Sequence, residues 1–242
     1  MAETKHILVL ANSVRDGKHC VAGKFAAPIE GAKFKIGQKW IRLADPRDPE
    51  GAVLGQTTVL AGGRSVRPLH IIKVALEGCC DDPNHPEDGR FDPNQRWEYV
   101  AAVSTDVLAQ TIDKPGQLWH EGSDDKAVPA GYVSRMGPQA ATLYLIKAPE
   151  DAVFTFWKEQ NRFENRIDTK RRMTFTYSGQ SQEFSVTDPS FTARHRIFDR
   201  ATGSLQSLRF TDRETYFCLS LTKLSAKFSR KHYKICATIF QK

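Results

Sequence analysis

The chain has 242 residues, of which 40% are hydrophobic and 26% charged, and it carries a formal net charge of +7. This composition is typical of a globular protein and excludes fibrous, collagen-like and intrinsically disordered classes. The sequence contains no run of about 18 apolar residues, which a membrane-spanning helix requires. Its length accommodates one large β domain or two small domains with cores of their own.

Strand-like segments dominate the first half of the chain. They are expected at residues 6–10, 19–25, 39–43, 68–76 and 97–103. Gly23 interrupts the second of these strands, which indicates a bulge or the close approach of another group.

Polar segments separate these strands. Residues 12–18 are predicted to form a loop, and residues 79–94 a second loop rich in Pro, Asp, Asn and Gly. A short helix is expected over residues 105–112, capped by Thr105. Residues 113–138 are polar with interspersed Gly and Pro, and they predict an irregular connecting segment.

The β pattern strengthens in the second half of the chain. Further strands are expected at residues 142–146, 152–157, 215–221 and 232–240. Residues 171–178 and 182–187 alternate apolar and polar side chains on either side of Ser178-Gly179, which predicts a hairpin of fixed register. About six short strands in about 100 residues favour a small closed or partly closed barrel. We therefore predict a mostly β protein with two barrels, 1–112 and 139–242, joined by residues 113–138.

Cysteine usage bears on the compartment. The five cysteines are Cys20, Cys79, Cys80, Cys218 and Cys236. An odd number without framework spacing indicates a reducing environment. The opening residues also lack the basic region and long apolar stretch of a secretory signal. We expect a cytoplasmic protein that does not associate with membranes.

Candidate sites for catalysis or metal binding are weak. Cys79, Cys80 and His85 lie close together, but adjacent cysteines seldom ligate one tetrahedral ion and no second ligand pair is present. The sequence has neither a serine nucleophile elbow nor a phosphate-binding glycine loop. We therefore expect no metal, no cofactor and no catalytic residue. Cys20 paired with a distant histidine stays open as an alternative.

Charge is the more informative feature. The excess of positive charge lies in residues 141–242, whereas residues 1–140 are close to neutral. Positive charge concentrated on one domain is expected in a protein whose partner is a polyanion, although many basic domains bind no polyanion.

Particular side chains fit a polyanion partner in the second half of the chain. Lys170, Arg171 and Arg172 open the predicted hairpin, and Lys234 lies in the last strand. Barrels that bind nucleic acid combine such a basic groove with exposed aromatic residues on which bases stack, and the candidates are Trp40, Trp157, Phe163 and Tyr233. We predict Arg171 and Arg172 as phosphate contacts, supported by Lys170 and Lys234. The alternative is that these cations are solvated strand edges and the aromatic residues are core.

The first half offers a second set of candidates. Asn12, Ser13 and Arg15 lie in the predicted loop, and Arg42 lies on a strand. We predict that these four also contact nucleic acid. Asn and Ser in a tight loop more often bond the neighbouring backbone, so a local structural role stays open for them.

Short segments along almost the whole chain resemble one family. They are ILVLANS at 7–13, CVAGK at 20–24, WIR at 40–42, LYLI at 143–146, KRR at 170–172, FSVTDP at 184–189, LSL at 219–221 and YKI at 233–235. In this order they resemble the dual OB-containing domain family. The resemblance implies two OB-like (oligonucleotide-binding-type) β-barrels and the recognition of nucleic acid beside separate effector proteins in prokaryotic conflict systems.

These observations lead to one functional hypothesis and two rivals. We predict a non-catalytic module that binds DNA or RNA and acts with an effector protein in prokaryotic defence. The first rival is a protein–protein adaptor that scaffolds a nuclease or ATPase. The second is an enzyme or small-nucleotide sensor that uses Cys20.

Overall fold

The computed structural model describes residues 2–15, 17–31, 33–122, 124–161, 165–195, 205–224 and 230–242, without the side chain of Arg15. The stacking candidate Phe163 lies outside these residues. Within it the chain forms two compact units. The first unit contains residues 1–113 and 131–145, and the second contains residues 114–130 and 146–242. Among the described residues, none of the helices has the length and apolar character needed to cross a membrane.

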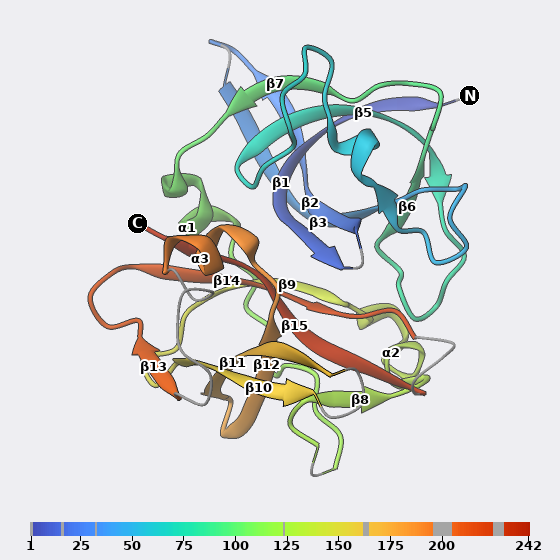
Figure 1. The fold of residues 1–242 in the computed structure, drawn as a ribbon. Helices are drawn as coiled ribbons and strands as arrows, with labels where there is room; N and C mark the ends of the chain where they lie inside the picture. Colours follow the sequence, from blue (N-terminus) through green and yellow to red (C-terminus); the bar gives the residue numbers. More distant parts are fainter. Residues whose placement is uncertain are drawn as a thin grey trace. The chain divides into compact units, whose positions relative to one another are not determined.

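The first unit is built on a coiled, mostly antiparallel sheet (Figure 1). Its strands are β1 (Glu3–Arg15), β2 (Lys18–Ile29), β3 (Lys33–Ala44), β4 (Val53–Leu54), β5 (His70–Cys79), β6 (Asp88–Phe91) and β7 (Glu98–Ala102). Its short helices are η1 (Gly55–Thr58), η2 (Thr105–Val107), α1 (Leu108–Thr111), α2 (Tyr132–Arg135) and η3 (Gly137–Gln139).

Five of these strands close into a barrel. β1 pairs with β2 and β2 with β3 in antiparallel fashion, and β3 then pairs in parallel with β6. β6 pairs with β5, and β5 returns to β1, which closes the barrel. This connectivity, with its one parallel pair, is that of the five-stranded Greek-key barrel called the OB-fold.

Alternating residues fill the interior of this barrel. Ile7 and Val9 of β1 meet Val21 of β2, together with Ile41 and Leu43 of β3, in one buried cluster. The period of two places alternate side chains of each strand inside, which is why the sequence pattern predicted these strands.

Gly23 marks a close approach between two strands of this barrel. A Cβ atom at this position would lie 2.0 Å from the backbone oxygen of Leu8, so only glycine fits. The close approach predicted from the sequence is therefore confirmed.

The second unit contains an eight-stranded sheet (Figure 1). Its strands are β8 (Ala127–Pro129), β9 (Leu143–Lys147), β10 (Val153–Asn161), β11 (Arg166–Tyr177), β12 (Gln180–Val186), β13 (Gln206–Arg209), β14 (Thr215–Leu221) and β15 (Lys231–Gln241), and its helix is α3 (Pro189–Arg194). β10, β11 and β12 are antiparallel neighbours, β12 pairs in parallel with β15, and β15 pairs with β14. The order of strands and the parallel pair repeat those of the first barrel.

The predicted hairpin of the second unit is confirmed in register. Met173 faces Phe184 across β11 and β12, and the turn consists of Ser178 and Gly179 with φ of 49° and 77°. Two positive φ values define the tight turn whose twist matches a hairpin. Inside the sheet, the rings of Phe175 and Phe184 stack with centroids 5.3 Å apart.

Two predicted loops are wrong in part. Residues 12–15 continue β1, because the pairing of Asn12 with Val21 and of Ser13 with Cys20 extends the ladder almost to the turn. Residues 88–91 form β6, because their backbone completes the barrel between β3 and β5. The predicted short helix over 105–112 is confirmed as η2 followed by α1, but its cap position is Ser104 rather than Thr105, and neither helix has a side-chain cap bond.

Candidate nucleic-acid interface

The outer face of β2 and β3 is closed in the first unit. OB-folds commonly bind oligonucleotides on the face formed by their second and third strands. Here Lys24 on β2 is fully buried, and its ammonium donates to the Thr111 carbonyl at 2.6 Å, to Asp113 at 2.6 Å and to Gln38 at 3.1 Å. Trp40 on β3 donates its indole N–H to Asp113 at 2.9 Å. The chain's own residues therefore occupy this face.

Arg42 lies on the same closed face and is only 5% exposed. Its guanidinium contacts the Asp88 carboxylate at 3.1 Å and the Thr142 hydroxyl at 3.0 Å. Glu87 in turn accepts from the Thr142 backbone N–H at 2.6 Å. Arg42 is thus a structural cation. The sequence analysis expected it to contact nucleic acid, but the structure buries it against the chain's own residues.

The other first-half candidates do not form an open loop. Asn12 donates its side-chain amide to the Val66 carbonyl at 3.0 Å, and its oxygen lies 2.6 Å from Nδ1 of His19. Ser13 is 6% exposed. The side chain of Arg15 lies outside the described residues. Asn12 therefore connects β1 to a distant segment and to β2, and burial lowers the pKa of its partner His19.

Lys170 and Arg172 do share one face with an aromatic residue in the second unit. Trp157 on β10 pairs with Lys170 on β11, and Thr155 pairs with Arg172. Residues two apart on a strand point to the same side, so Lys170 and Arg172 share the outer face of β11. All three side chains are half-buried, and Trp157 donates its indole N–H to Glu159 at 2.8 Å.

Acidic neighbours accompany both of these cations. The Lys170 ammonium lies 3.4 Å from Glu159 and 3.3 Å from Asp168, and the Arg172 guanidinium lies 3.0 Å from Glu183. Such solvent-accessible ion pairs stabilise a protein by only about 0–1 kcal/mol each. A phosphate group can therefore compete for these cations at small cost.

The remaining predicted cations point the other way. Arg171 lies on the side of β11 that carries Met173, and its guanidinium donates to Thr192 of α3 at 3.1 Å. Burial lowers the pKa of Arg171. Lys234 on β15 is 1% exposed and donates to Gln182 at 2.9 Å. The four cations that the sequence analysis placed in one basic groove therefore lie on two different sides of the sheet.

Lys234 gives the second unit a distinct dependence on pH. Burial lowers its pKa from 10.5 to about 8, against the opposing influence of Asp125 and Asp124. Between these two values the unfolded chain keeps the proton that the folded chain has lost, so the free energy of unfolding rises with pH. We expect the wild type to gain about 1–3 kcal/mol relative to Lys234→Met between about pH 7.5 and 10. Urea titrations of both proteins measure this difference, and a flat or falling difference contradicts the assignment.

A cationic and aromatic cluster on the first unit was missed by the sequence analysis. The guanidinium of Arg64 lies 4.0 Å from the centre of the Tyr99 ring, and the His70 ring meets Tyr99 edge-on at 5.2 Å. Burial, together with Arg64 and Arg67, lowers the pKa of His70. The one sequence signal is Gly62-Gly63 before Arg64, and nothing in that signal points to Tyr99, 35 positions further along.

No group of three or more His, Cys, Asp or Glu side chains within the described residues is arranged to hold a metal ion. None of the five cysteines forms a disulfide bond. Cys20 pairs with Ser13 across β1 and β2, whereas its neighbour His19 pairs with Val14 and bonds Asn12. The two adjacent side chains therefore point to opposite faces of the strand.

A closed five-stranded barrel and a second sheet of the same connectivity define a protein built on OB-type barrels. The model of one family, the dual OB-containing domain, matches residues 5–239, so the chain belongs to this family. A comparison with curated proteins gave no match.

Proposed function

We propose that the protein is a non-catalytic module that recognises nucleic acid on the outer face of β10, β11 and β12. The observation that carries the proposal is the placement of Trp157, Lys170 and Arg172 on one half-exposed sheet face. In their pairing, β10, β11 and β12 correspond to β1, β2 and β3 of the first barrel. β11 and β12 therefore take the place of the second and third strands, which form the usual ligand face of an OB-fold.

The chemistry of this face suits single-stranded nucleic acid. Lys170 and Arg172 release counterions when they neutralise phosphates, which supplies affinity without dependence on sequence. The indole of Trp157 offers a stacking surface, and such stacking contributes about 1–3 kcal/mol per base. The equivalent face of the first barrel is filled by Lys24, Trp40 and their partners, so we assign the binding of nucleic acid to the second unit.

The family and the cysteine state support a setting for this activity. We place this activity beside a separate effector protein in prokaryotic defence, as the resemblance to the dual OB-containing domain family implies. Five cysteines without a disulfide bond are consistent with a reducing, cytoplasmic location.

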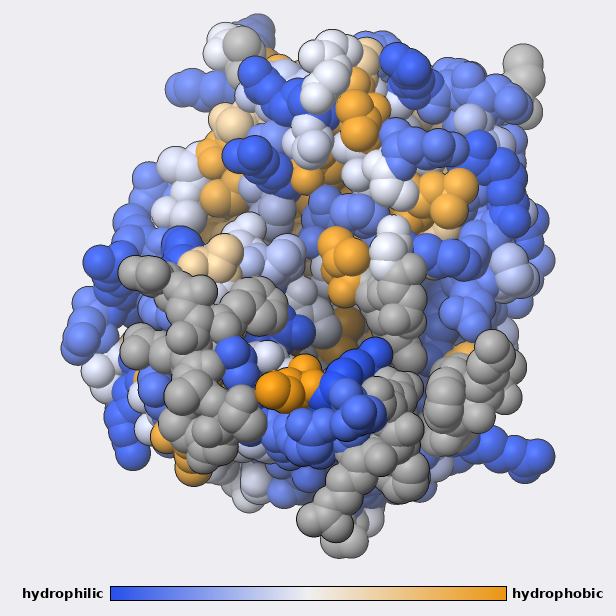
Figure 2. All heavy atoms as spheres, viewed as in Figure 1, coloured by the Kyte–Doolittle hydropathy of each residue, from blue (hydrophilic) through white to orange (hydrophobic). Residues whose placement is uncertain are grey.

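The adaptor hypothesis receives less support. An adaptor surface is expected to show an exposed apolar patch of several hundred Å². On the face drawn in Figure 2, the hydrophobic residues occur in small separate groups. Among the described residues, the large hydrophobic side chains that are exposed are Val14, Ile29, Val59, Val100, Ile167, Leu205 and Tyr233.

The test is a salt titration of single-stranded oligonucleotide binding by fluorescence anisotropy. We expect the Lys170→Gln/Arg172→Gln variant to lose at least about tenfold in affinity and to reduce the salt slope by about 1.4, since each phosphate contact contributes about 0.7 for a single strand. Trp157→Ala is expected to lose about tenfold while keeping the slope.

Lys73→Gln is the matched control. Lys73 is a half-buried lysine of the first barrel with an acidic partner, Glu98, at 3.1 Å, so it resembles Lys170 in both respects. Its substitution is expected to leave affinity within about twofold. Equal losses in the control and the test variants, or no binding at low salt, overturn the proposal.

A further inference from the structure

The cationic and aromatic cluster of the first unit contains two arginines that are not neutralised. Arg64 and Arg67 lie on the loop between η1 and β5, and both are exposed. Neither of them forms an ion pair within the described part of the chain. By contrast, Lys24, Arg42 and Arg47 of the same unit are each paired with an aspartate. The positive charge of the two loop arginines is therefore available to a ligand.

The backbone of this loop is fixed by hydrogen bonds. The Leu60 N–H donates to the Arg64 carbonyl at 2.8 Å, which closes a tight turn over two glycines of positive φ. The Val66 N–H donates to the last residue of η1 at 2.8 Å, and the Val66 carbonyl accepts from the side-chain amide of Asn12 on β1 at 3.0 Å. The loop is thus ordered before any ligand binds, which lowers the entropic cost of binding.

Tyr99 on β7 orients the guanidinium of Arg64. The guanidinium carbon lies 4.0 Å from the centre of the Tyr99 ring, within the range of about 6 Å for a cation–π interaction. Tyr99 is half-buried and packs against the barrel core, so its ring is held in place. A guanidinium that lies over a ring keeps the N–H donors at its edge free, and their fork matches two oxygens of a phosphate group.

His70, the first residue of β5, adds an N–H donor to the cluster. Its Nδ1 accepts the backbone N–H of Arg67 at 3.3 Å, so the neutral imidazole carries its proton on Nε2. The His70 ring also meets the Tyr99 ring edge-on, with centroids 5.2 Å apart. Burial, Arg64 and Arg67 together lower the pKa of His70, so both guanidinium groups lie near enough to act on this ring.

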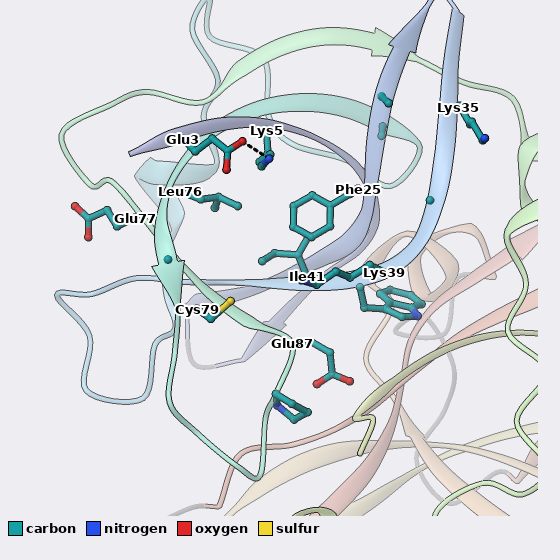
Figure 3. Close-up of a pocket in the computed structure, with 16 residues that line it drawn as sticks. Glu3, Lys5, Phe25, Lys35, Lys39, Ile41, Leu76, Glu77, Cys79 and Glu87 are labelled. Atoms are coloured by element: carbon teal, nitrogen blue, oxygen red, sulfur yellow. Dashed lines mark hydrogen bonds and ion pairs between the residues drawn. The ribbon is translucent and has the colours of Figure 1, made fainter. Parts of the chain in front are cut away.

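The cavity at one end of the first barrel is a weaker candidate (Figure 3). It has a volume of about 720 Å³ and an apolar floor around Phe25. At its rim Lys5 is paired with Glu3, and the side chains of Lys35 and Glu77 point away from the cavity in Figure 3. Its charged groups therefore do not converge, and an apolar floor alone does not select a ligand.

We infer that Arg64 and Arg67, together with His70, bind a phosphate group on the first unit. A phosphate group offers more oxygen acceptors than a carboxylate, so it can accept from two guanidinium groups and an imidazole at once. The interface proposed above lies on the second unit, so either assignment can fail alone.

The test is calorimetric titration of the full chain with inorganic pyrophosphate and with citrate, a carboxylate anion of similar charge. We expect pyrophosphate to bind at least about tenfold more tightly than citrate. Arg64→Gln/Arg67→Gln is expected to weaken pyrophosphate at least about tenfold, because it removes both charge-assisted donors. Tyr99→Leu keeps both cations but releases Arg64 from the ring, and it is expected to weaken pyrophosphate about threefold.

Arg90→Gln is the matched control. Arg90 is an exposed arginine of the first barrel without an ion pair in the described part of the chain. It pairs with Gly78, eight positions along β5 from His70, which corresponds to roughly 26 Å at about 3.3 Å per residue. Charges so far apart are screened from each other by salt, so Arg90→Gln is expected to leave pyrophosphate affinity within about twofold.

A single-stranded oligonucleotide identifies the source of the phosphate group. If Arg64→Gln/Arg67→Gln also lowers oligonucleotide affinity and reduces the salt slope by about 1.4, the nucleic-acid backbone supplies the phosphate. If oligonucleotide binding is unchanged or absent, a free phosphorylated compound supplies it; both results agree with the site. No binding at about 1 mM pyrophosphate, equal affinity for citrate, or equal pyrophosphate affinities in Arg64→Gln/Arg67→Gln and Arg90→Gln overturns the inference.

Discussion

Asp88→Ala is expected to destabilise the first unit by about 3–5 kcal/mol, because it leaves the buried guanidinium of Arg42 without its carboxylate. The Asp88 side chain is fully buried, and Arg42 is 5% exposed. Burial opposes the charged form of Arg42, but Asp88, Cys20 and Glu87 together hold its pKa above the usual value. Urea unfolding followed by tryptophan fluorescence measures the loss.

A double variant separates the loss of the pair from the burial of a lone charge. Arg42→Leu/Asp88→Leu removes both charges and is expected to be at least about 2 kcal/mol more stable than Asp88→Ala, since buried ion pairs are often replaceable by apolar residues. If Asp88→Ala costs less than about 1 kcal/mol, water or Thr142 satisfies Arg42 and the assignment is wrong.

Much of the fold was predictable because its strands alternate. Met173, Phe175 and Phe184 predicted both the hairpin and its register, and the structure pairs Met173 with Phe184 as expected. The loop at residues 79–94 hid β6, because Asp88 and Gly89 carry the turn-like composition of their surroundings. Only the tertiary pairing with β3 makes this short segment a strand.

The candidate site was predictable only in part, for a reason of periodicity. Neighbours on a strand face opposite ways, so Lys170-Arg171-Arg172 cannot form one patch, and Arg171 turns to Thr192. Lysine and arginine are usually exposed, but Lys24 and Arg42 are buried against Asp113 and Asp88. These two aspartates lie 89 and 46 positions further along the chain, so no local sequence pattern reveals either pair.

Asp113→Ala is the second large expected effect, at about 3–5 kcal/mol. One carboxylate accepts from the buried Lys24 ammonium at 2.6 Å, from the Trp40 indole at 2.9 Å and from the Leu145 backbone N–H at 2.7 Å. Its removal leaves the fully buried Lys24 ammonium without its carboxylate, and it leaves the Trp40 and Leu145 donors without this acceptor. Urea unfolding is the measurement, and Asp106→Ala, at an exposed aspartate seven positions earlier, is expected to change stability by no more than about 0.5 kcal/mol.

The same variant tests where nucleic acid binds. Loss of Asp113 frees Lys24 and Trp40 on the face of β2 and β3, which the wild type fills with its own residues. If the oligonucleotide binds only on β11 and β12, the folded Asp113→Ala variant keeps the wild-type oligonucleotide affinity within about twofold, despite its lower stability. A gain of about tenfold would instead mean that the first barrel holds a second face blocked by its own chain, with Asp113 as the contact that keeps it shut.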